Sequence, residues 1–383
     1  MEFNFLQPIS SELLLFKESL STQHLGSKIV VHSENELPDL ENIKIALIGV
    51  LENRDFEGFI QKIDLSEIRK QLYALYPGNW ITQMADLGDI LPGNSKEDTF
   101  FALQNIVSSL IKKKIITVII GGTQDLTYAM YRSYDNLDQM VNLVSIDSKF
   151  DFGKENEPIS KDSYLTKIIV DEPNNLFNFS NIGFQTYYNS QEEIDLIEKL
   201  YFDAIRLGEV SQNMTIAEPV FRDADLVALD VSSVKSADSG NQNNFEPNGF
   251  NGKEICTLAR YAGISDRLTS FGVFNYNNSK NEPVLISQII WYFIEGVNFR
   301  SHEYPFGSKE EYSKYIVTSE NEDLIFLKSN VSNRWWIEIT EFKTKNTKIK
   351  KNTLLPCSYE DYLSACNNEF PERWWKWQRK INV

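Results

Sequence analysis

The sequence has little histidine. Its 383 residues contain only three histidines, His24, His32 and His302. Histidine is the side chain most used for proton transfer near neutral pH and for binding transition metals. None of the three lies near another chemistry-bearing motif, so a site that needs two histidines would have to gather them from distant segments.

Cysteine and long apolar runs are also scarce. Cys256, Cys357 and Cys366 form an odd set without the spacing of a metal site. Free thiols fit a reducing compartment, so we expect a cytoplasmic protein. No apolar run approaches the roughly 18 residues that a membrane span requires, and the residues after Met1 do not resemble a signal peptide.

Basic residues are outnumbered and unevenly placed. Lys and Arg total 38 against 54 Asp and Glu, a net charge of −16. So acidic a chain argues against binding nucleic acid or anionic membranes. Residues 334–383 nevertheless carry ten basic and six acidic side chains, so this part is +4 and residues 1–333 are −20. Five of the seven tryptophans also lie there.

This shift in composition indicates three parts. We expect residues 1–42 to be an N-terminal segment that packs on a core, residues 43–300 to form an α/β domain, and residues 301–383 to form a basic, Trp-rich extension. The last boundary is placed near Pro305 and Gly307, which interrupt the pattern.

The central part alternates apolar strands with amphipathic helices. Short apolar runs predict buried strands over 43–50, 115–120, 141–146, 181–184, 204–207, 226–231 and 269–274. Helical spacing over 96–111, 126–134, 253–262 and 285–293 separates several of them, with Ser95 and Asp98 as a capping pair. Strands that alternate with helices predict a parallel sheet covered on both faces.

Polar clusters follow three of these strands. They are Gly-Gly-Thr-Gln-Asp at 121–125, Asp-Ser-Lys-Phe-Asp at 147–151 and Asp-Val-Ser-Ser at 230–233. Ligands of open α/β sheets bind at the carboxyl ends of the strands. Each cluster alone is typical of a turn or a helix cap, but the three together predict a site.

The order and spacing of these clusters resemble the arginase/ureohydrolase family, which includes arginase, agmatinase and formimidoylglutamase. The family motifs are Gly-Gly-Asp-His-Ser, Asp-Ala-His-x-Asp and Ser-x-Asp-x-Asp, and the resemblance covers roughly residues 43–298. It implies a three-layer α/β/α sandwich with a mainly parallel sheet. It also implies hydrolysis of a guanidino or formimidoyl group by a hydroxide that bridges two manganese ions.

The metal motifs are degenerate in this sequence. Compared with the family pattern, three carboxylates are kept, and three ligand positions are changed. The six positions are Gln124 (His in the family), Asp147 (kept), Lys149 (His), Asp151 (kept), Asp230 (kept) and Ser232 (Asp). Both metal-binding histidines are therefore missing, and a lysine ammonium has no lone pair to offer a metal.

These changes lead us to expect no cofactor and no metal. Our hypothesis is that Lys149 replaces the metal as an internal cation among Asp147, Asp151 and Asp230, whose charges would otherwise repel one another. The alternative is one divalent ion, Mg²⁺ or Mn²⁺, held by those three carboxylates and by Asp125.

The extension contains two Arg-Trp-Trp triplets. Residues 335–339 have strand character, and residues 359–366 and 374–380 have helical character. One interpretation is that the tryptophans pack the extension onto the core. The other is a protein-binding surface, because Trp and Arg dominate interface hot spots; its residues would be Trp335, Trp336, Arg373, Trp374 and Trp375. A lysine-rich stretch over 343–351 reads as a solvated turn or a basic contact for an acidic partner.

The resulting prediction is a catalytically inactive, arginase-like protein that acts as a structural or protein-binding component, with a protein partner or self-association. The alternative is a divergent metal-dependent C–N hydrolase that acts on a guanidino or formimidoyl compound. Fold alone does not decide between them, because function depends on the site.

Overall fold

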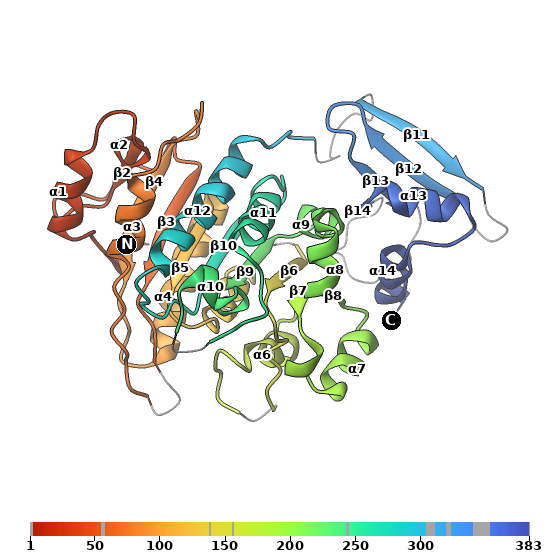
Figure 1. Cartoon of the computed structure of the whole chain (residues 1–383), viewed down its shortest axis with the longest axis horizontal. Coiled ribbons are helices and arrows are strands. Elements are labelled where there is room, and N and C mark those ends of the chain that lie inside the picture. The colour runs from red at the N-terminus through yellow and green to blue at the C-terminus, as the bar shows by residue number, and fades with distance from the viewer. Residues whose placement is uncertain are drawn as a thin grey trace.

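A ten-stranded sheet runs through the middle of the body (Figure 1). The computed structural model describes residues 3–54, 58–137, 139–154, 157–242, 245–303, 311–318, 323–339 and 353–382. The strand order is β1-β4-β3-β5-β10-β9-β6-β7-β8, and β2 also pairs with β4. The strands are β1 (Leu6–Gln7), β2 (Ile29–Val31), β3 (Ile45–Val50), β4 (Met84–Ile90), β5 (Ile116–Gly121), β6 (Val141–Ile146), β7 (Leu176–Phe184), β8 (Asp203–Arg206), β9 (Leu226–Asp230) and β10 (Ser270–Phe274).

The sheet is mainly parallel. β1 pairs antiparallel with β4, whereas the pairs that join β2 through β10 are parallel. Every residue of β3, β5, β6, β9 and β10 is buried, as continuous apolar runs predict for strands covered on both faces. The predicted strands are confirmed, although β7 begins at Leu176, well before the predicted start.

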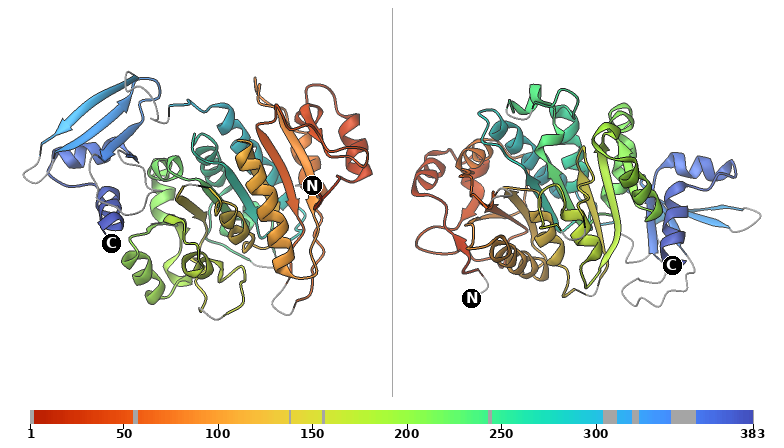
Figure 2. Two further views of the ribbon diagram at one scale, coloured as in Figure 1. Left: turned by 180° about the vertical axis from the view of Figure 1, so that it is seen from behind. Right: turned by 90° about the horizontal axis from the view of Figure 1, so that it is seen from below.

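Helices cover both faces and enclose two separate hydrophobic cores (Figure 2). One layer holds α1 (Ser11–Ser19), α2 (Leu25–Lys28), α3 (Ser66–Tyr73), α8 (Leu207–Gln212), α9 (Glu218–Arg222), α11 (Gly252–Gly263) and α12 (Glu282–Asn298). The other holds α4 (Lys96–Lys112), α5 (Leu126–Arg132), α6 (Tyr164–Val170) and α7 (Gln191–Lys199). The short α10 (Ser236–Ser239) precedes α11. Two helical layers around one parallel sheet confirm the predicted α/β/α class.

β4 is a strand that the apolar pattern does not predict. Its sequence contains Asp86 and Asp89, which interrupt the apolar run. Asp86 is nevertheless buried, because it accepts hydrogen bonds from Nε of Arg69 at 2.8 Å and from the hydroxyl of Tyr73 at 2.7 Å. Two partners on α3 thus satisfy a charge that would otherwise be costly inside the sheet.

The C-terminal extension forms its own sheet beyond the β8 edge of the large one (Figure 1). The antiparallel order is β11-β12-β13-β14, and two helices follow. The predicted strand over 335–339 and the predicted helix over 359–366 are confirmed. The elements are β11 (Tyr312–Val317), β12 (Leu324–Ser329), β13 (Trp335–Ile339), β14 (Thr353–Cys357), α13 (Tyr359–Cys366) and α14 (Glu372–Asn382).

A buried arginine of the body holds this second sheet. Arg222 ends α9, and its two terminal nitrogens donate to the backbone carbonyls of Trp335 and Cys357, each at 2.9 Å. Lys376 adds an ion pair of 3.4 Å to Asp203. The basic extension therefore contacts the acidic body within one chain.

Two expectations about the extension fall on segments that the structure leaves undescribed. Pro305 and Gly307, which mark the expected boundary, and the lysine-rich stretch over 343–351 lie outside the described residues. Among the described residues, no helix combines the length and apolar character needed to cross a membrane.

Candidate functional site

The three polar clusters meet at one edge of the large sheet. β5, β6 and β9 end at Gly121, Ile146 and Asp230, and they lie close together in the strand order. Because these strands are parallel, their carboxyl ends point to the same edge. The predicted convergence of the motifs is what the structure shows.

Gln124 occupies the centre of this edge and is fully buried. Its Nε2 donates to Oδ2 of Asp147 at 2.7 Å and also approaches the hydroxyls of Tyr164 at 3.1 Å and Ser145 at 3.4 Å. Its Oε1 accepts from Nδ2 of Asn275 at 3.2 Å. The amide thus turns an N–H toward the carboxylate, where the family motif would place a histidine nitrogen.

Three buried carboxyl groups share the site. Burial raises the pKa of Asp147 to about 7, with added repulsion from Asp230. Burial, and then repulsion from Asp147 and Asp230, raise the pKa of Asp151 well above its ordinary value. Burial also raises the pKa of Asp230, although hydrogen bonds from Ser232 oppose the shift. Uncompensated like charges therefore favour protonation.

Ser232 serves Asp230 as a hydrogen-bond donor. Its backbone N–H donates to Oδ1 at 2.7 Å, and its hydroxyl donates to Oδ2 at 2.5 Å. These bonds fix the short 3₁₀ turn Val231–Ser233 that follows β9. Both oxygens of Asp230 are thus satisfied by the residue that replaces the family's second carboxylate.

Lys149 does not act as an internal cation in this structure. Its ammonium lies 3.3 Å from Oδ1 of Asp162, and the side chain is 47% exposed. The described ion pairs of Lys149 do not include Asp147, Asp151 or Asp230. The structure therefore gives Lys149 an exposed partner, Asp162, where the hypothesis expects direct pairing with the three carboxylates; attraction to Asp151 and Asp147 contributes only in part to its raised pKa.

Asp125 is not available as a further ligand either. Nζ of Lys96 lies 2.6 Å from its Oδ2, and the hydroxyl of Thr123 donates to its Oδ1 at 2.6 Å. This buried carboxylate is therefore paired with Lys96 at the start of α4 and with Thr123 of its own loop. The fourth oxygen donor expected for a single-ion site therefore has another role.

The residue set does not fit a site for two metal ions. Within the described ranges, no group of three or more His, Cys, Asp or Glu side chains is arranged to hold a metal. Gln124 and Ser232 place hydrogen-bond donors on the oxygens of Asp147 and Asp230. One feature favours an ion: Oδ2 of Asp151 is buried and has no hydrogen-bond partner among the described atoms. The three carboxylates can supply ligands for at most one ion.

The histidines lie elsewhere, as predicted. His24 stacks on Tyr76, with ring centroids 4.6 Å apart, and His32 contacts the carbonyl of Leu87 at 3.1 Å. His302 lies 3.8 Å from Asp266 and is 85% exposed.

The tryptophans of the extension are mostly inside it. Trp335, Trp336 and Trp374 are no more than 7% exposed, so they cannot contact a partner in this conformation. Arg373 donates to the carbonyl of Pro356 at 2.9 Å. Trp375 alone among the five predicted partner-binding residues presents a large exposed surface, at 46%. The packing interpretation thus describes three of the four tryptophans in that set.

Tyr164 and Glu282 are polar residues of this region that the sequence patterns did not single out. Tyr164 comes from a stretch without a recognisable motif, and its hydroxyl reaches Gln124. Glu282 begins α12, is fully buried, and accepts from the backbone N–H groups of Asn277 and Ser279. The sequence signal that could have pointed to Glu282 is its position directly after an Asn-rich loop.

Comparisons with known proteins agree with the motif resemblance. A family model described as the arginase family matches residues 65–281. A formimidoylglutamase of Lysinibacillus sphaericus is 25% identical over 122 residues, 31% of this chain and 37% of that relative, so the match spans well under half of the relative's length.

Two solved structures show the same fold. A formiminoglutamase of Trypanosoma cruzi with Mn²⁺ superposes with a TM-score of 0.59 at 16% identity, covering 69% of this chain and all of that one. An agmatine ureohydrolase of Thermoplasma volcanium gives 0.56 at 18% identity, covering 75% and 97%. The manganese of the trypanosomal relative corrects the expectation of no cofactor: the relatives point to manganese.

Proposed function

The chain belongs to the arginase family, and we propose that within this family it is a binding protein that does not hydrolyse guanidino or formimidoyl compounds. The supporting observation is the hydrogen bond from Nε2 of Gln124 to Oδ2 of Asp147, 2.7 Å long. An amide N–H has no lone pair for a metal, and it occupies the oxygen that the family motif would turn toward one.

Manganese is considered in this proposal because a structural relative, the trypanosomal formiminoglutamase, contains it. Asp147, Asp151 and Asp230 are the carboxylates that could offer oxygens to Mn²⁺, but they would have to rearrange to do so, because Gln124 and Ser232 hold oxygens of two of them. Such an ion would supply positive charge that keeps the three carboxylates ionised. Gln124 and Ser232 would keep these carboxylates oriented, because each already donates to one of them. A two-ion centre would need the ligands that Gln124, Lys149 and Ser232 replace.

A second candidate function is a divergent C–N hydrolase with one manganese ion. The observation that favours it is the buried, unpartnered Oδ2 of Asp151.

The binding role would use the surface of the extension. Trp375 is exposed on α14, and the guanidinium of Arg379 lies 5.8 Å from its ring centre. An exposed Trp–Arg pair is the kind of anchor that protein interfaces use. Light scattering detects a second copy of this chain as the partner, and affinity capture detects another protein.

An activity assay tests the loss of hydrolysis. Purified chain loaded with Mn²⁺ is incubated with arginine, agmatine and formimidoylglutamate, and urea and formamide are measured, with an active formimidoylglutamase as positive control. We expect no product above the buffer blank. Product formation that disappears in Asp230→Asn would favour the hydrolase instead.

A binding assay tests the surface. The full chain and its Trp375→Ala variant are compared by light scattering over a concentration series and by affinity capture from the source cells. We expect an assembly that the full chain forms and the variant loses. The matched control is Phe101→Ala, which removes an exposed aromatic side chain of α4 in the body.

A further inference from the structure

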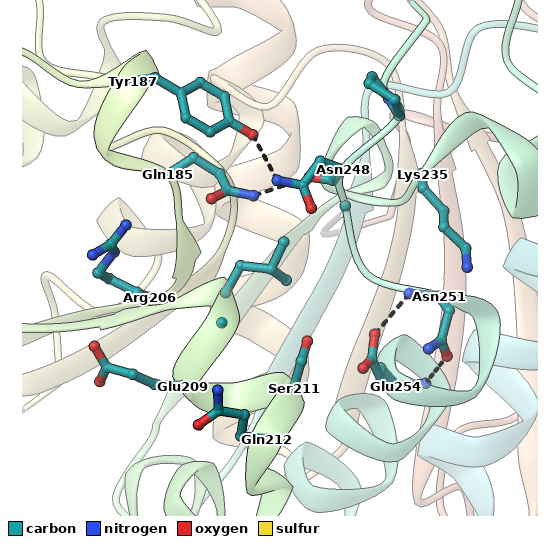
Figure 3. A pocket seen from close by; sticks show the side chains of 14 residues that line it. Gln185, Tyr187, Arg206, Glu209, Ser211, Gln212, Lys235, Asn248, Asn251 and Glu254 are labelled. Carbon is teal, nitrogen blue, oxygen red and sulfur yellow. Dashed lines mark hydrogen bonds between the residues drawn. The ribbon is translucent and has the colours of Figure 1, made fainter.

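Charge is balanced in a cavity of the body and unbalanced in a helix of the extension. The cavity, of about 720 Å³, opens beside the ends of β7 and β8 (Figure 3). Arg206 and Lys235 lie at opposite sides of it and point away from each other, and Glu209 and Glu254 match them in number. By contrast, α14 carries four basic side chains and one acid. The charge of α14 therefore favours an acidic partner.

α14 also forms one wall of a small hollow. The hollow has a volume of about 270 Å³ and is lined by Tyr201, which follows α7, and by Glu372, Trp375, Lys376 and Arg379. It is smaller than the sites of about 300–1,000 Å³ that hold small molecules, but it has room for one large side chain. Pockets of this kind receive the anchor residues of protein interfaces.

Two side chains of the α14 hollow are free to contact a partner. The ring of Trp375 is 46% exposed, and an edge contact with Trp374 supports it, with ring centroids 5.4 Å apart. The guanidinium of Arg379 lies 5.8 Å from the centre of the Trp375 ring and has no hydrogen bond or ion pair among the described residues. Lys376, by contrast, is paired with Glu372 at 2.8 Å. Arg379 is therefore available to an incoming carboxylate.

The chain itself contains a segment with complementary chemistry. Residues 33–42, Ser-Glu-Asn-Glu-Leu-Pro-Asp-Leu-Glu-Asn, join β2 to β3 without a helix or strand, and we call them the acidic segment. Leu37, in the middle of the segment, is 36% exposed. The four acids are also exposed, and within the part of the chain that the structure describes they form no ion pair. They are Glu34, Glu36, Asp39 and Glu41.

The α14 hollow and the acidic segment lie too far apart to meet within one chain. β2 and β3, which the acidic segment joins, lie toward one end of the long axis of the molecule, and α14 lies toward the other (Figure 1). A contact between the two surfaces therefore requires two copies. Because the two surfaces differ, such a contact is head-to-tail.

We propose that the acidic segment of one copy binds the α14 hollow of a second copy, with Leu37 against Trp375 and the carboxylates beside Leu37 at Arg379. The inference rests on the proposed binding function of Trp375 and names its partner. Opposite charges at the contact offset the repulsion between two chains of net charge −16. A contact made by one short segment is small, so the association should be weak and sensitive to salt.

Light scattering of the full chain over a concentration series measures the association. At low ionic strength we expect the mean mass to rise above that of one chain as the concentration increases, and to fall back when salt is added. Arg379→Ala removes the cation, and Glu36→Arg places like charges at the contact, so each should weaken the association by at least about tenfold. Lys253→Ala, which removes an exposed lysine of α11, is the matched control and should associate as the parent does.

Mixing the two variants tests the head-to-tail geometry. Arg379→Ala keeps the acidic segment and Glu36→Arg keeps the α14 hollow, so an equal mixture can form one intact contact and should approach the mass of a dimer. Each variant alone should stay closer to a monomer at the same concentration. A synthetic peptide of residues 33–42 should dissociate the parent assembly, and the same peptide with its four acids replaced by the corresponding amides should not.

The outcomes separate this inference from the proposed function. A parent that stays a monomer at every concentration, or a mixture no larger than its two components, overturns the head-to-tail contact. Capture of another protein that requires Trp375 would then still support the proposed binding function. Release of urea or formamide contradicts the loss of hydrolysis and leaves the contact standing.

Discussion

Nε2 of Gln124 donates a 2.7 Å hydrogen bond to Oδ2 of Asp147 at the carboxyl edge of the sheet. This contact gives a buried carboxyl group a donor from within the protein. Together with the hydroxyl of Ser232 on Asp230, it supplies protein donors to two of the three buried carboxyl groups. Buried polar groups need such partners, and donors at positions where the family motifs have metal ligands are why we propose that this protein has stopped hydrolysing.

The Gln124 contact should matter for stability. Gln124→Ala removes the donor of a buried carboxyl group, and we expect the free energy of unfolding in urea to fall by about 1–3 kcal/mol. The control is Gln191→Ala on the exposed side of α7, whose amide bonds Asp195 and whose loss should change stability by less than about 0.5 kcal/mol. Equal effects of the two variants would show that the Gln124 bond is unimportant.

Removing the side chain of Lys149 should change the stability of the protein very little. Its pair with Asp162 is exposed, with side chains 47% and 56% accessible. Such pairs contribute at most about 1 kcal/mol to stability. The free energy of unfolding of Lys149→Ala should therefore differ from that of the parent by no more than this amount. Lys154→Ala, at another exposed pair, is the control. A much larger loss would restore Lys149 as the counter-charge of the buried carboxylates.

Arg222 should hold the extension to the body. Its buried guanidinium donates to two carbonyls of the extension and lies 4.6 Å from the ring centre of Trp336. Arg222→Ala leaves those carbonyls without their donor and Glu218 with Arg334 as its remaining ion-pair partner. Breaking such a buried pair costs about 3–5 kcal/mol.

Limited proteolysis measures that change. We expect Arg222→Ala to release the extension much faster than the parent does. Arg379→Ala, which removes an exposed arginine stacked on Trp375, should be cleaved at the parental rate. Parental resistance in Arg222→Ala would mean that the extension is held by its other contacts.

Lys380 gives the extension a pH dependence. Burial lowers the pKa of Lys380 to about 8 from 10.5, and Lys376 and Arg373 add to the lowering, whereas Asp203 opposes it. Between these two values the unfolded chain binds more protons than the folded one, so stability rises as the pH increases from 8 to 10.5.

A variant isolates that contribution. Subtracting the unfolding free energy of Lys380→Met from that of the parent should leave a difference that grows in the parent's favour by about 2–3 kcal/mol over this range. Lys253→Met, an exposed lysine on α11, should give a difference that is flat with pH. A difference for Lys380 that is flat, or that falls, would contradict the lowered pKa.

Patterns of neighbouring residues in the sequence predicted much of the fold. The apolar run over 141–146 matches β6 at both ends, and Ser95 with Asp98 forms the predicted capping box of α4. β4 escaped prediction because its acids are neutralised by Arg69, which lies on another element. Pairing between distant residues leaves no trace in a local pattern.

The candidate site was predictable in position and not in detail. Motif order placed Gln124, Asp147 and Asp230 together, because parallel strands end at one edge. The direction of Lys149 depends on a flexible side chain that could reach either the carboxylates or Asp162. The tryptophans of the extension were ambiguous for a similar reason: core and interface favour the same residue type.

Manganese stoichiometry tests the central claim most directly. The purified chain is dialysed against excess Mn²⁺ at pH 8, passed through a desalting column, and measured by elemental analysis alongside Asp147→Asn. The account predicts at most one manganese per chain, lost in the variant, and no urea or formamide release from the loaded protein. Two manganese ions per chain together with product release would contradict it.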